Sequence, residues 1–94
     1  MTRKYSVPWF RRQDYDAIKR LVTDDLIPDT FDEWLEKSTK VVSEWQARGD
    51  AVEKVIVDPQ QFAAWCLASG MGHDFATLGA FAIAMARKKR EHGA

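Results

Sequence analysis

Residues 51–61 read Ala51-Val52-Glu53-Lys54-Val55-Ile56-Val57-Asp58-Pro59-Gln60-Gln61, and this stretch decides the fold. The three β-branched side chains that precede Asp58 favour a strand. Asp58 is a good N-cap and Pro59 suits the first position of a helix, so the strand should pass directly into a helix. We expect that helix to end at Gly70, because glycine readily adopts the left-handed conformation found just beyond a helix.

This strand needs a partner, since an unpaired buried peptide group costs on the order of 1–3 kcal/mol. Residues 3–10 offer one, because apolar side chains alternate along them. Pro8 lacks a backbone donor, which would confine such a strand to a sheet edge. Alternatively, the Val52–Val57 strand pairs with its own copy in a second chain. We favour pairing within the chain.

The best-marked helix begins after Thr30, a good N-cap that Glu33 completes as a capping box. Gly49 is its natural stop. One face carries an apolar stripe of Phe31, Trp34, Leu35, Val41, Val42 and Trp45. The opposite face carries three acidic-then-basic pairs, each worth about 0.2–0.5 kcal/mol: Glu33–Lys37, Glu36–Lys40 and Glu44–Arg48. The pattern predicts an amphipathic helix with a solvated outer face.

Two further helices are expected over residues 13–24 and residues 75–90. The chain is therefore predicted to be an α+β, mostly α fold: four helices with one short strand or a two-stranded hairpin. Residues 1–94 should form a single small globular domain in which residues 1–4 and 91–94 fray.

The composition excludes several classes of protein. Hydrophobic residues make up 46% of the chain and aromatic residues 12%, enough for a core without disulfides or metal. The 14 basic and 14 acidic residues cancel, so no long-range field draws the molecule to nucleic acid or an anionic membrane. The first residues lack the apolar segment of a signal peptide, and no apolar run approaches the roughly 20 residues of a membrane span. We expect a cytoplasmic protein.

The last helix carries no charged residue from Phe75 to Met85. A helix that is apolar on all sides is normally buried on more than one side. Three interpretations remain open: a core helix enclosed by the other three, a homodimer interface, and a helix on a membrane surface. The side expected to face the core carries Phe75, Leu78, Ala82 and Met85. The candidate interface residues are Phe75, Ala76, Leu78, Ala80, Phe81, Ile83 and Ala84.

A basic run, Arg87, Lys88, Lys89 and Arg90, follows the uncharged segment. Cations are favoured at a helix C-terminus by the helix dipole, and they are also candidate contacts for nucleic-acid phosphates. Residues 59–90 have the order of a helix–turn–helix. However, the first turn of the second helix offers almost no side chains that read base edges, so we treat nucleic-acid binding as an alternative.

The residues with catalytic potential are few. Cys66, the single cysteine, is expected on the inner side of its helix, where a thiol behaves as an inert hydrophobe. His73 lies in a glycine-bounded turn, so a Cys66–His73 nucleophile is conceivable. Asp74 is better explained as the cap of the last helix. With two histidines and no phosphate- or dinucleotide-binding pattern, we predict no metal, no cofactor and no enzyme activity.

Trp9 and Phe10 precede Arg11 and Arg12. Aromatic side chains beside arginines can form a surface that binds peptides or nucleotides. They also anchor an N-terminal arm to the core, and we favour that interpretation.

Three motifs of the chain are similar to those of small uncharacterised bacterial proteins. They are PWFRR-x-DY at residues 8–15, T-F-DEWL at residues 30–35 and VDP-x-x-F-x-x-WC at residues 57–66. The resemblance covers most of the chain up to Gly70. That family has no assigned activity, so the resemblance transfers no catalytic or binding residue and implies only a bacterial, stand-alone, cytoplasmic domain.

Our functional hypothesis is a non-enzymatic protein-interaction module that acts as a homodimer through the helix of residues 75–85. The alternative is a small regulatory nucleic-acid-binding protein that uses Arg87 to Arg90. A thiol-dependent enzyme built on Cys66 is the third hypothesis.

Overall fold

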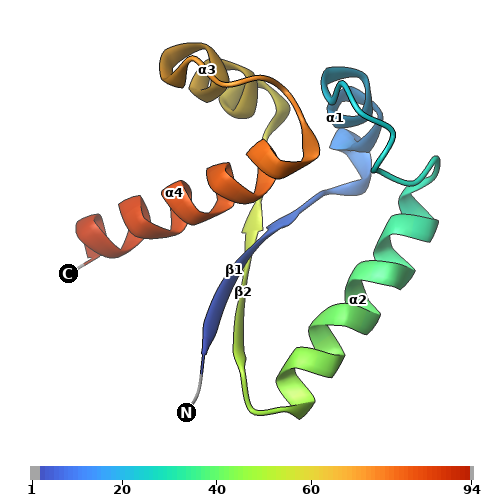
Figure 1. Cartoon of the computed structure of the whole chain (residues 1–94), viewed down its shortest axis with the longest axis vertical. Coiled ribbons are helices and arrows are strands. Elements are labelled where there is room, and N and C mark those ends of the chain that lie inside the picture. The colour runs from blue at the N-terminus through green and yellow to red at the C-terminus, as the bar shows by residue number, and fades with distance from the viewer. Residues whose placement is uncertain (1–2, 94) are drawn as a thin grey trace.

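The computed structural model describes residues 3–93, with side chains as far as Lys89. The fold is α+β and mostly helical, with four helices and two strands in the described residues, which confirms the predicted fold class. Figure 1 shows the elements. In chain order they are β1 (Lys4–Trp9), a short 3-10 helix η1 (Arg12–Asp14), α1 (Tyr15–Leu21), α2 (Phe31–Ala47), β2 (Ala51–Ile56), α3 (Pro59–Ser69) and α4 (Phe75–Gly93).

The two strands pair with each other within the chain and run parallel. Their register extends from Lys4 opposite Ala51 to Trp9 opposite Ile56. Beyond β2 the ladder continues with the Val57 N–H, which donates to the Trp9 carbonyl at 2.9 Å. Parallel strands need a long crossover, so α1 and α2 connect the pair and a hairpin turn does not.

The ends of the described chain are regular. The Arg3 carbonyl accepts a hydrogen bond from the Ala51 N–H at 2.7 Å and Lys4 pairs with Ala51, so residues 3 and 4 lie against β2, while the fraying expected over residues 1–4 stays a prediction. Residues 1, 2 and 94 lie outside the described residues. α4 continues through residues 91–93, a few residues further than expected.

The predicted helix boundaries are mostly confirmed by capping contacts. Thr30 Oγ1 accepts the Glu33 N–H at 3.2 Å, and Asp58 caps α3 while Gly70 ends it with a φ of 68°. α1 is shorter than predicted and ends at Leu21. It stops there because the Thr23 N–H donates to the carbonyl of His73, at 2.7 Å, and not to a carbonyl of α1.

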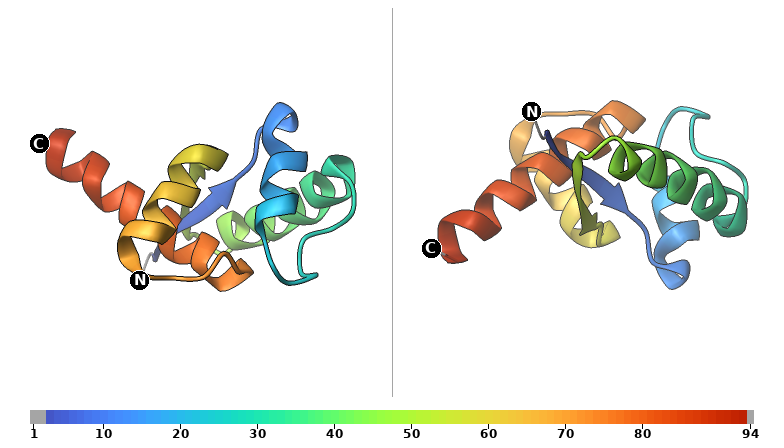
Figure 2. Two further views of the ribbon diagram at one scale, coloured as in Figure 1. Left: turned by 90° about the horizontal axis from the view of Figure 1, so that it is seen from above. Right: turned by 90° about the horizontal axis from the view of Figure 1, so that it is seen from below.

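α2 and α4 lie on opposite sides of the strand pair, while α1 and α3 lie beyond the carboxyl ends of the strands (Figures 1 and 2). Tyr5 and Trp9 of β1 pack against Trp45 and Trp34 of α2, with ring centroids 4.8 and 4.9 Å apart. The largest fully buried side chains come from α1, α3, α4 and the end of β2: Tyr15, Ile18, Val57, Phe62, Cys66, Leu78 and Phe81.

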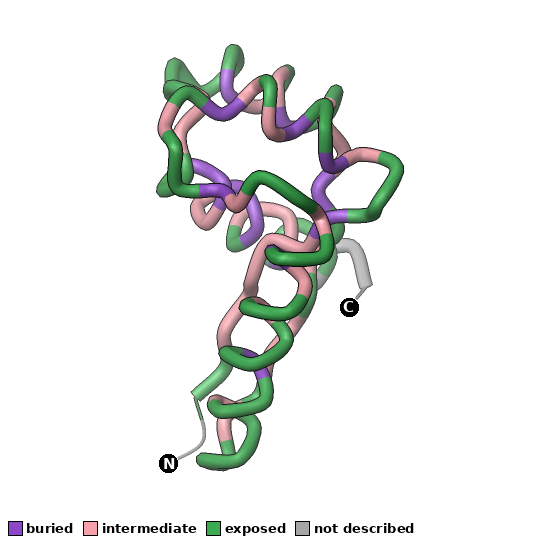
Figure 3. Tube along the Cα trace, turned by 90° about the vertical axis from the view of Figure 1, so that its right-hand side faces the viewer, coloured by how far each residue is buried: buried purple, intermediate pink, exposed green. Residues whose placement is uncertain are grey.

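α2 is only partly covered. Of its 17 residues, Trp34 and Val42 are buried, and Figure 3 shows the lower turns of this helix as mostly exposed. Val41, which the sequence placed on the core-facing stripe, is 41% exposed. The apolar stripe of α2 is therefore wider than the surface that the rest of the described chain packs against it.

Candidate interaction surfaces

The seven α4 residues predicted as an interface divide into two sets. Leu78 and Phe81 are buried in the core of their own chain, so their assignment to an interface was wrong. The Phe81 ring packs edge-on against Phe62 and Trp65 of α3, at 5.5 and 5.6 Å between centroids. The other five are exposed or half-buried: Phe75, Ala76, Ala80, Ile83 and Ala84.

The outer face of α4 is a narrow apolar stripe. Ala76, Gly79, Ala80 and Ile83 recur at the spacing of one helical face, and Ile83 is 45% exposed. A methyl group built on Gly79 would meet no atom within 4 Å, so no described side chain covers the stripe there. Phe75, expected to face the core, lies instead at the boundary of this face and is exposed.

The basic run follows the stripe. Arg87, Lys88 and Lys89 are exposed, whereas the Arg90 side chain lies outside the described part. Figure 1 shows that this end of α4 extends away from the other helices. Of the three described cations, Lys89 lines a hollow with Glu53 and Lys54 of β2, so this end of α4 still borders the strand pair.

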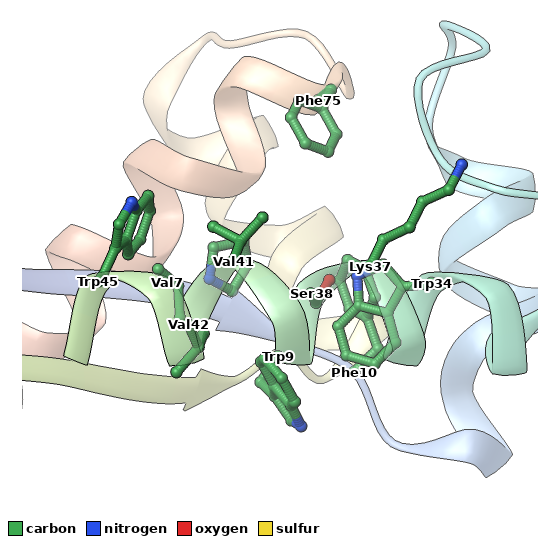
Figure 4. A pocket seen from close by; sticks show the side chains of 11 residues that line it. Val7, Trp9, Phe10, Trp34, Lys37, Ser38, Val41, Val42, Trp45 and Phe75 are labelled. Atoms are coloured by element: carbon green, nitrogen blue, oxygen red, sulfur yellow. The ribbon is translucent and has the colours of Figure 1, made fainter. Parts of the chain in front are cut away.

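A second surface is a groove beside β1, which we call the β1–α2 groove. It holds about 300 Å³ and its lining is almost entirely apolar. Figure 4 shows the side chains around it, which come from β1, α2 and the start of α4. The lining residues are Val7, Pro8, Trp9, Phe10, Trp34, Lys37, Ser38, Val41, Val42, Trp45 and Phe75.

Aromatic contacts fix the walls of the β1–α2 groove. The Trp34 ring lies 4.9 Å from Trp9 and 4.7 Å from Phe10, measured between centroids. The Lys54 ammonium lies 4.3 Å from the centre of the Trp9 ring, a cation–π contact that holds the indole in place. The aromatic part of the groove is therefore formed by rings that are packed on one another.

Among the described residues, Lys37 is the one charged residue that lines the groove. The sequence predicted that it pairs with Glu33, but Glu33 is used in the capping box with Thr30. None of the three i,i+4 pairs predicted on α2 forms an ion pair in the part of the chain that the structure describes. Figure 4 shows the Lys37 side chain reaching from α2 towards the side on which Phe75 lies.

The two arginines after Phe10 have structural partners. Arg11 Nε lies 2.6 Å from Asp14, and Arg12 bonds to Asp32 at 2.8 Å while its guanidinium covers the Phe31 ring at 4.6 Å. Both arginines are therefore engaged with residues of their own chain. The aromatic residues before them have two roles, because Trp9 and Phe10 anchor β1 and also line the groove.

The thiol chemistry considered from the sequence finds no support in the geometry. Cys66 is fully buried, and burial together with the nearby Asp74 carboxylate raises the pKa of its thiol. The His73 ring packs against Phe62 at 5.9 Å between centroids. Asp74 caps α4 as predicted: its Oδ1 accepts hydrogen bonds from the N–H and hydroxyl of Thr77 at 2.8 and 2.7 Å.

The acidic residues before α2 also have local partners. Asp29 bonds to Lys19 at 2.8 Å, which holds the pKa of its carboxyl below the ordinary value. Asp24 accepts the N–H of Phe75 at 3.1 Å and so ties this loop to the start of α4. Among the described residues, no three His, Cys, Asp or Glu side chains are grouped so that they could hold a metal ion.

Within residues 3–93, none of the helices combines the length and apolar character that a membrane crossing requires. A scan against protein-family models, a search of curated proteins and a search of solved structures each found no match to this chain. The resemblance to small bacterial proteins stays a prediction, and function has to be argued from the two surfaces.

Sequence reasoning identified the outer face of α4 and missed the β1–α2 groove. It treated the apolar residues of α2 as one core stripe and those of residues 7–10 as an anchor. Pro8 gave the available signal, because a proline in a strand marks an open edge, and an open edge lined by aromatic residues is a candidate groove.

Proposed function

We propose that the protein is a non-enzymatic interaction module that acts as a homodimer through the outer face of α4. The observation that carries the proposal is the uncharged stripe of Ala76, Gly79, Ala80 and Ile83, which is exposed at its two ends and half-buried at Gly79 and Ala80. Solvated helix faces normally carry charged residues, whereas small residues let two helix backbones approach closely. A second copy of α4 is therefore the occupant that suits this face.

The surface area supports a missing partner. The chain exposes 6404 Å², whereas a folded monomer of its mass is expected to expose about 5,500 Å². The excess is similar to the roughly 800 Å² that each partner buries in a standard interface. The radius of gyration of 13.6 Å also exceeds the about 12 Å expected for this chain length.

An antiparallel arrangement of the two α4 helices brings the basic end of each helix close to carboxylates of the partner. A parallel pair would bring the two basic ends together, and like charges at close range repel. In the antiparallel pair, Arg87 and Lys88 of each chain lie at the start of the partner helix, where Asp74 and Asp24 provide carboxylates.

Sedimentation over a dilution series tests the proposal. We expect a dimer at micromolar concentration that Ala80→Glu converts to monomer, because the substitution places two charges in an apolar contact. Ala47→Glu, which makes the same change at an exposed site on α2, is the matched control and should remain dimeric. A wild-type chain that sediments as a monomer at every concentration would exclude this function.

A second candidate function is nucleic-acid binding through Arg87 to Lys89. The observation that favours it is that this end of α4 extends away from the other helices (Figure 1). Affinity for short duplex or single-stranded DNA should then fall steeply with salt, and replacing the three cations with glutamine should reduce the salt slope. Absence of binding at low salt would end this candidate.

A further inference from the structure

The floor of the β1–α2 groove is the open edge of β1. The carbonyls of Arg3 and Trp9 bond to the β2 side, so the backbone groups of Ser6 and Pro8 face the open edge. Pro8 has no N–H to donate, which breaks the hydrogen-bond ladder that an added strand would need. Recognition in this groove must therefore come from side-chain burial.

The shape of the groove suits a linear apolar chain. Its wall on α2 runs from Trp34 to Trp45, a rise of about 16 Å along the helix axis. Val41 and Phe75 border it and are 41% and 44% exposed, so apolar surface remains to be covered there. A volume near 300 Å³ lies at the small end of the range for organic ligands, which is about 300–1,000 Å³.

The positive charge at the border of the groove indicates which polar group a ligand would carry there. Lys37 reaches its border and forms no ion pair with a described carboxylate, and no acidic residue of the described chain lines the groove. A ligand carboxylate would supply the partner that Glu33 does not provide. An amine at the same place would be repelled by the ammonium.

We propose that the β1–α2 groove binds a linear amphipathic carboxylate, an acyl chain of medium length whose carboxylate pairs with Lys37. The acyl chain lies along the exposed α2 wall at Val41, beside the packed aromatic rings, and Phe75 covers it from the side of α4. This site is separate from the outer face of α4, and it does not depend on the proposed homodimer.

The tryptophans provide a direct measurement. Trp9, Trp34 and Trp45 line the groove, whereas Trp65 packs on Phe81 elsewhere. In a Trp65→Phe background, the intrinsic fluorescence therefore reports on the groove alone. Titration with hexanoate, octanoate and decanoate should give saturable changes, with affinity rising by up to about fourfold for each added methylene.

Two variants and a neutral ligand test the geometry. Val41→Glu places a charge on the apolar wall and should abolish decanoate binding, while circular dichroism checks that the fold persists. Lys37→Gln should weaken decanoate binding by up to about fivefold and leave decanol binding unchanged. The matched control is Lys40→Gln, which lies one turn along α2 but does not line the groove.

Each outcome decides the proposal. Absence of saturable binding, or affinity that does not depend on chain length, would overturn it. The same holds if Val41→Glu converts a dimer to a monomer, because a second copy would then occupy the groove. Ala80→Glu separates the two surfaces: the proposed ligand site predicts that this variant keeps its decanoate affinity whatever its oligomeric state.

Discussion

α2 and α4 lie on opposite sides of the same two strands, yet their exposed surfaces differ. α2 has a charged outer face, and its apolar inner stripe is only partly covered. α4 has a fully packed inner face at Leu78 and Phe81, and its outer face is uncharged and only partly covered. An apolar stripe therefore shows which residues avoid water, but it does not show whether residues of the same chain cover them.

The incomplete cover of α2 follows from the dimensions of the sheet. α2 runs alongside the strands (Figure 1). A helix with its side chains is about 10–12 Å wide, whereas two neighbouring strands are separated by only about 4.8 Å. Where α2 extends past the edge of β1, its apolar side chains have no sheet beneath them. The β1–α2 groove lies at this overhang.

The largest expected effect comes from the inner face of α4. Phe81→Ala should lower the free energy of unfolding by about 3–5 kcal/mol, because it leaves a cavity beside Phe62 and Trp65. The matched control Ile83→Ala on the outer face should change it by less than about 0.5 kcal/mol. Urea unfolding at concentrations where the chain is monomeric measures both, and equal losses would contradict the assignment of inner and outer faces.

The stabilising contact of Tyr15 with the segment before α2 should be lost at high pH. Burial, with smaller contributions from Glu33, Asp29 and Asp16, raises the pKa of Tyr15 to about 12, and its hydroxyl donates to the Pro28 carbonyl.

The folded state holds the Tyr15 hydroxyl proton more tightly than the unfolded state does. The contribution of this hydroxyl to the free energy of unfolding is therefore complete below pH 10 and is lost as the pH rises towards 12. The loss should be about 2–3 kcal/mol. Urea unfolding from pH 9 to 12 measures it. Tyr15→Phe is the control, and a decrease as steep in that variant would show that Tyr15 is not the cause.

Removal of an N-cap should have a smaller effect on the free energy of unfolding. One such variant in each helix allows α2 and α4 to be compared directly. Thr30→Ala removes the oxygen that accepts the Glu33 N–H and should cost α2 about 1 kcal/mol. Asp74→Ala should cost α4 more, because Asp74 accepts two hydrogen bonds from Thr77 and is held in its charged form by them. Thermal unfolding at pH 7 ranks the variants, and the reverse order would contradict this account.

The smallest effect is expected on the charged face of α2. Lys40→Gln should change the free energy of unfolding by less than about 0.5 kcal/mol, because Lys40 forms no ion pair with a described carboxylate. Urea unfolding at low and high salt should give the same small difference. A loss above 1 kcal/mol would show that the predicted Glu36–Lys40 pair forms in solution.

Local sequence determined the elements of this protein. The cap at Thr30, the strand-to-helix junction at Asp58-Pro59 and the stop at Gly70 depend on neighbouring residues, so their patterns predicted these boundaries. The position of Pro8 likewise predicted an edge strand. The uncharged segment of α4 indicated a second apolar face, and the described structure leaves Ala76 and Ile83 of that face exposed.

Only the tertiary structure decided how these elements combine. The parallel direction of the strands, the early end of α1 at Leu21 and the burial of Phe81 depend on contacts between residues far apart in the chain. The β1–α2 groove is of the same kind, because it needs the edge of β1, the overhang of α2 and Phe75 in one place. Periodicity gives the direction of a side chain from its own element, whereas what that side chain meets is set by the packing of the other elements.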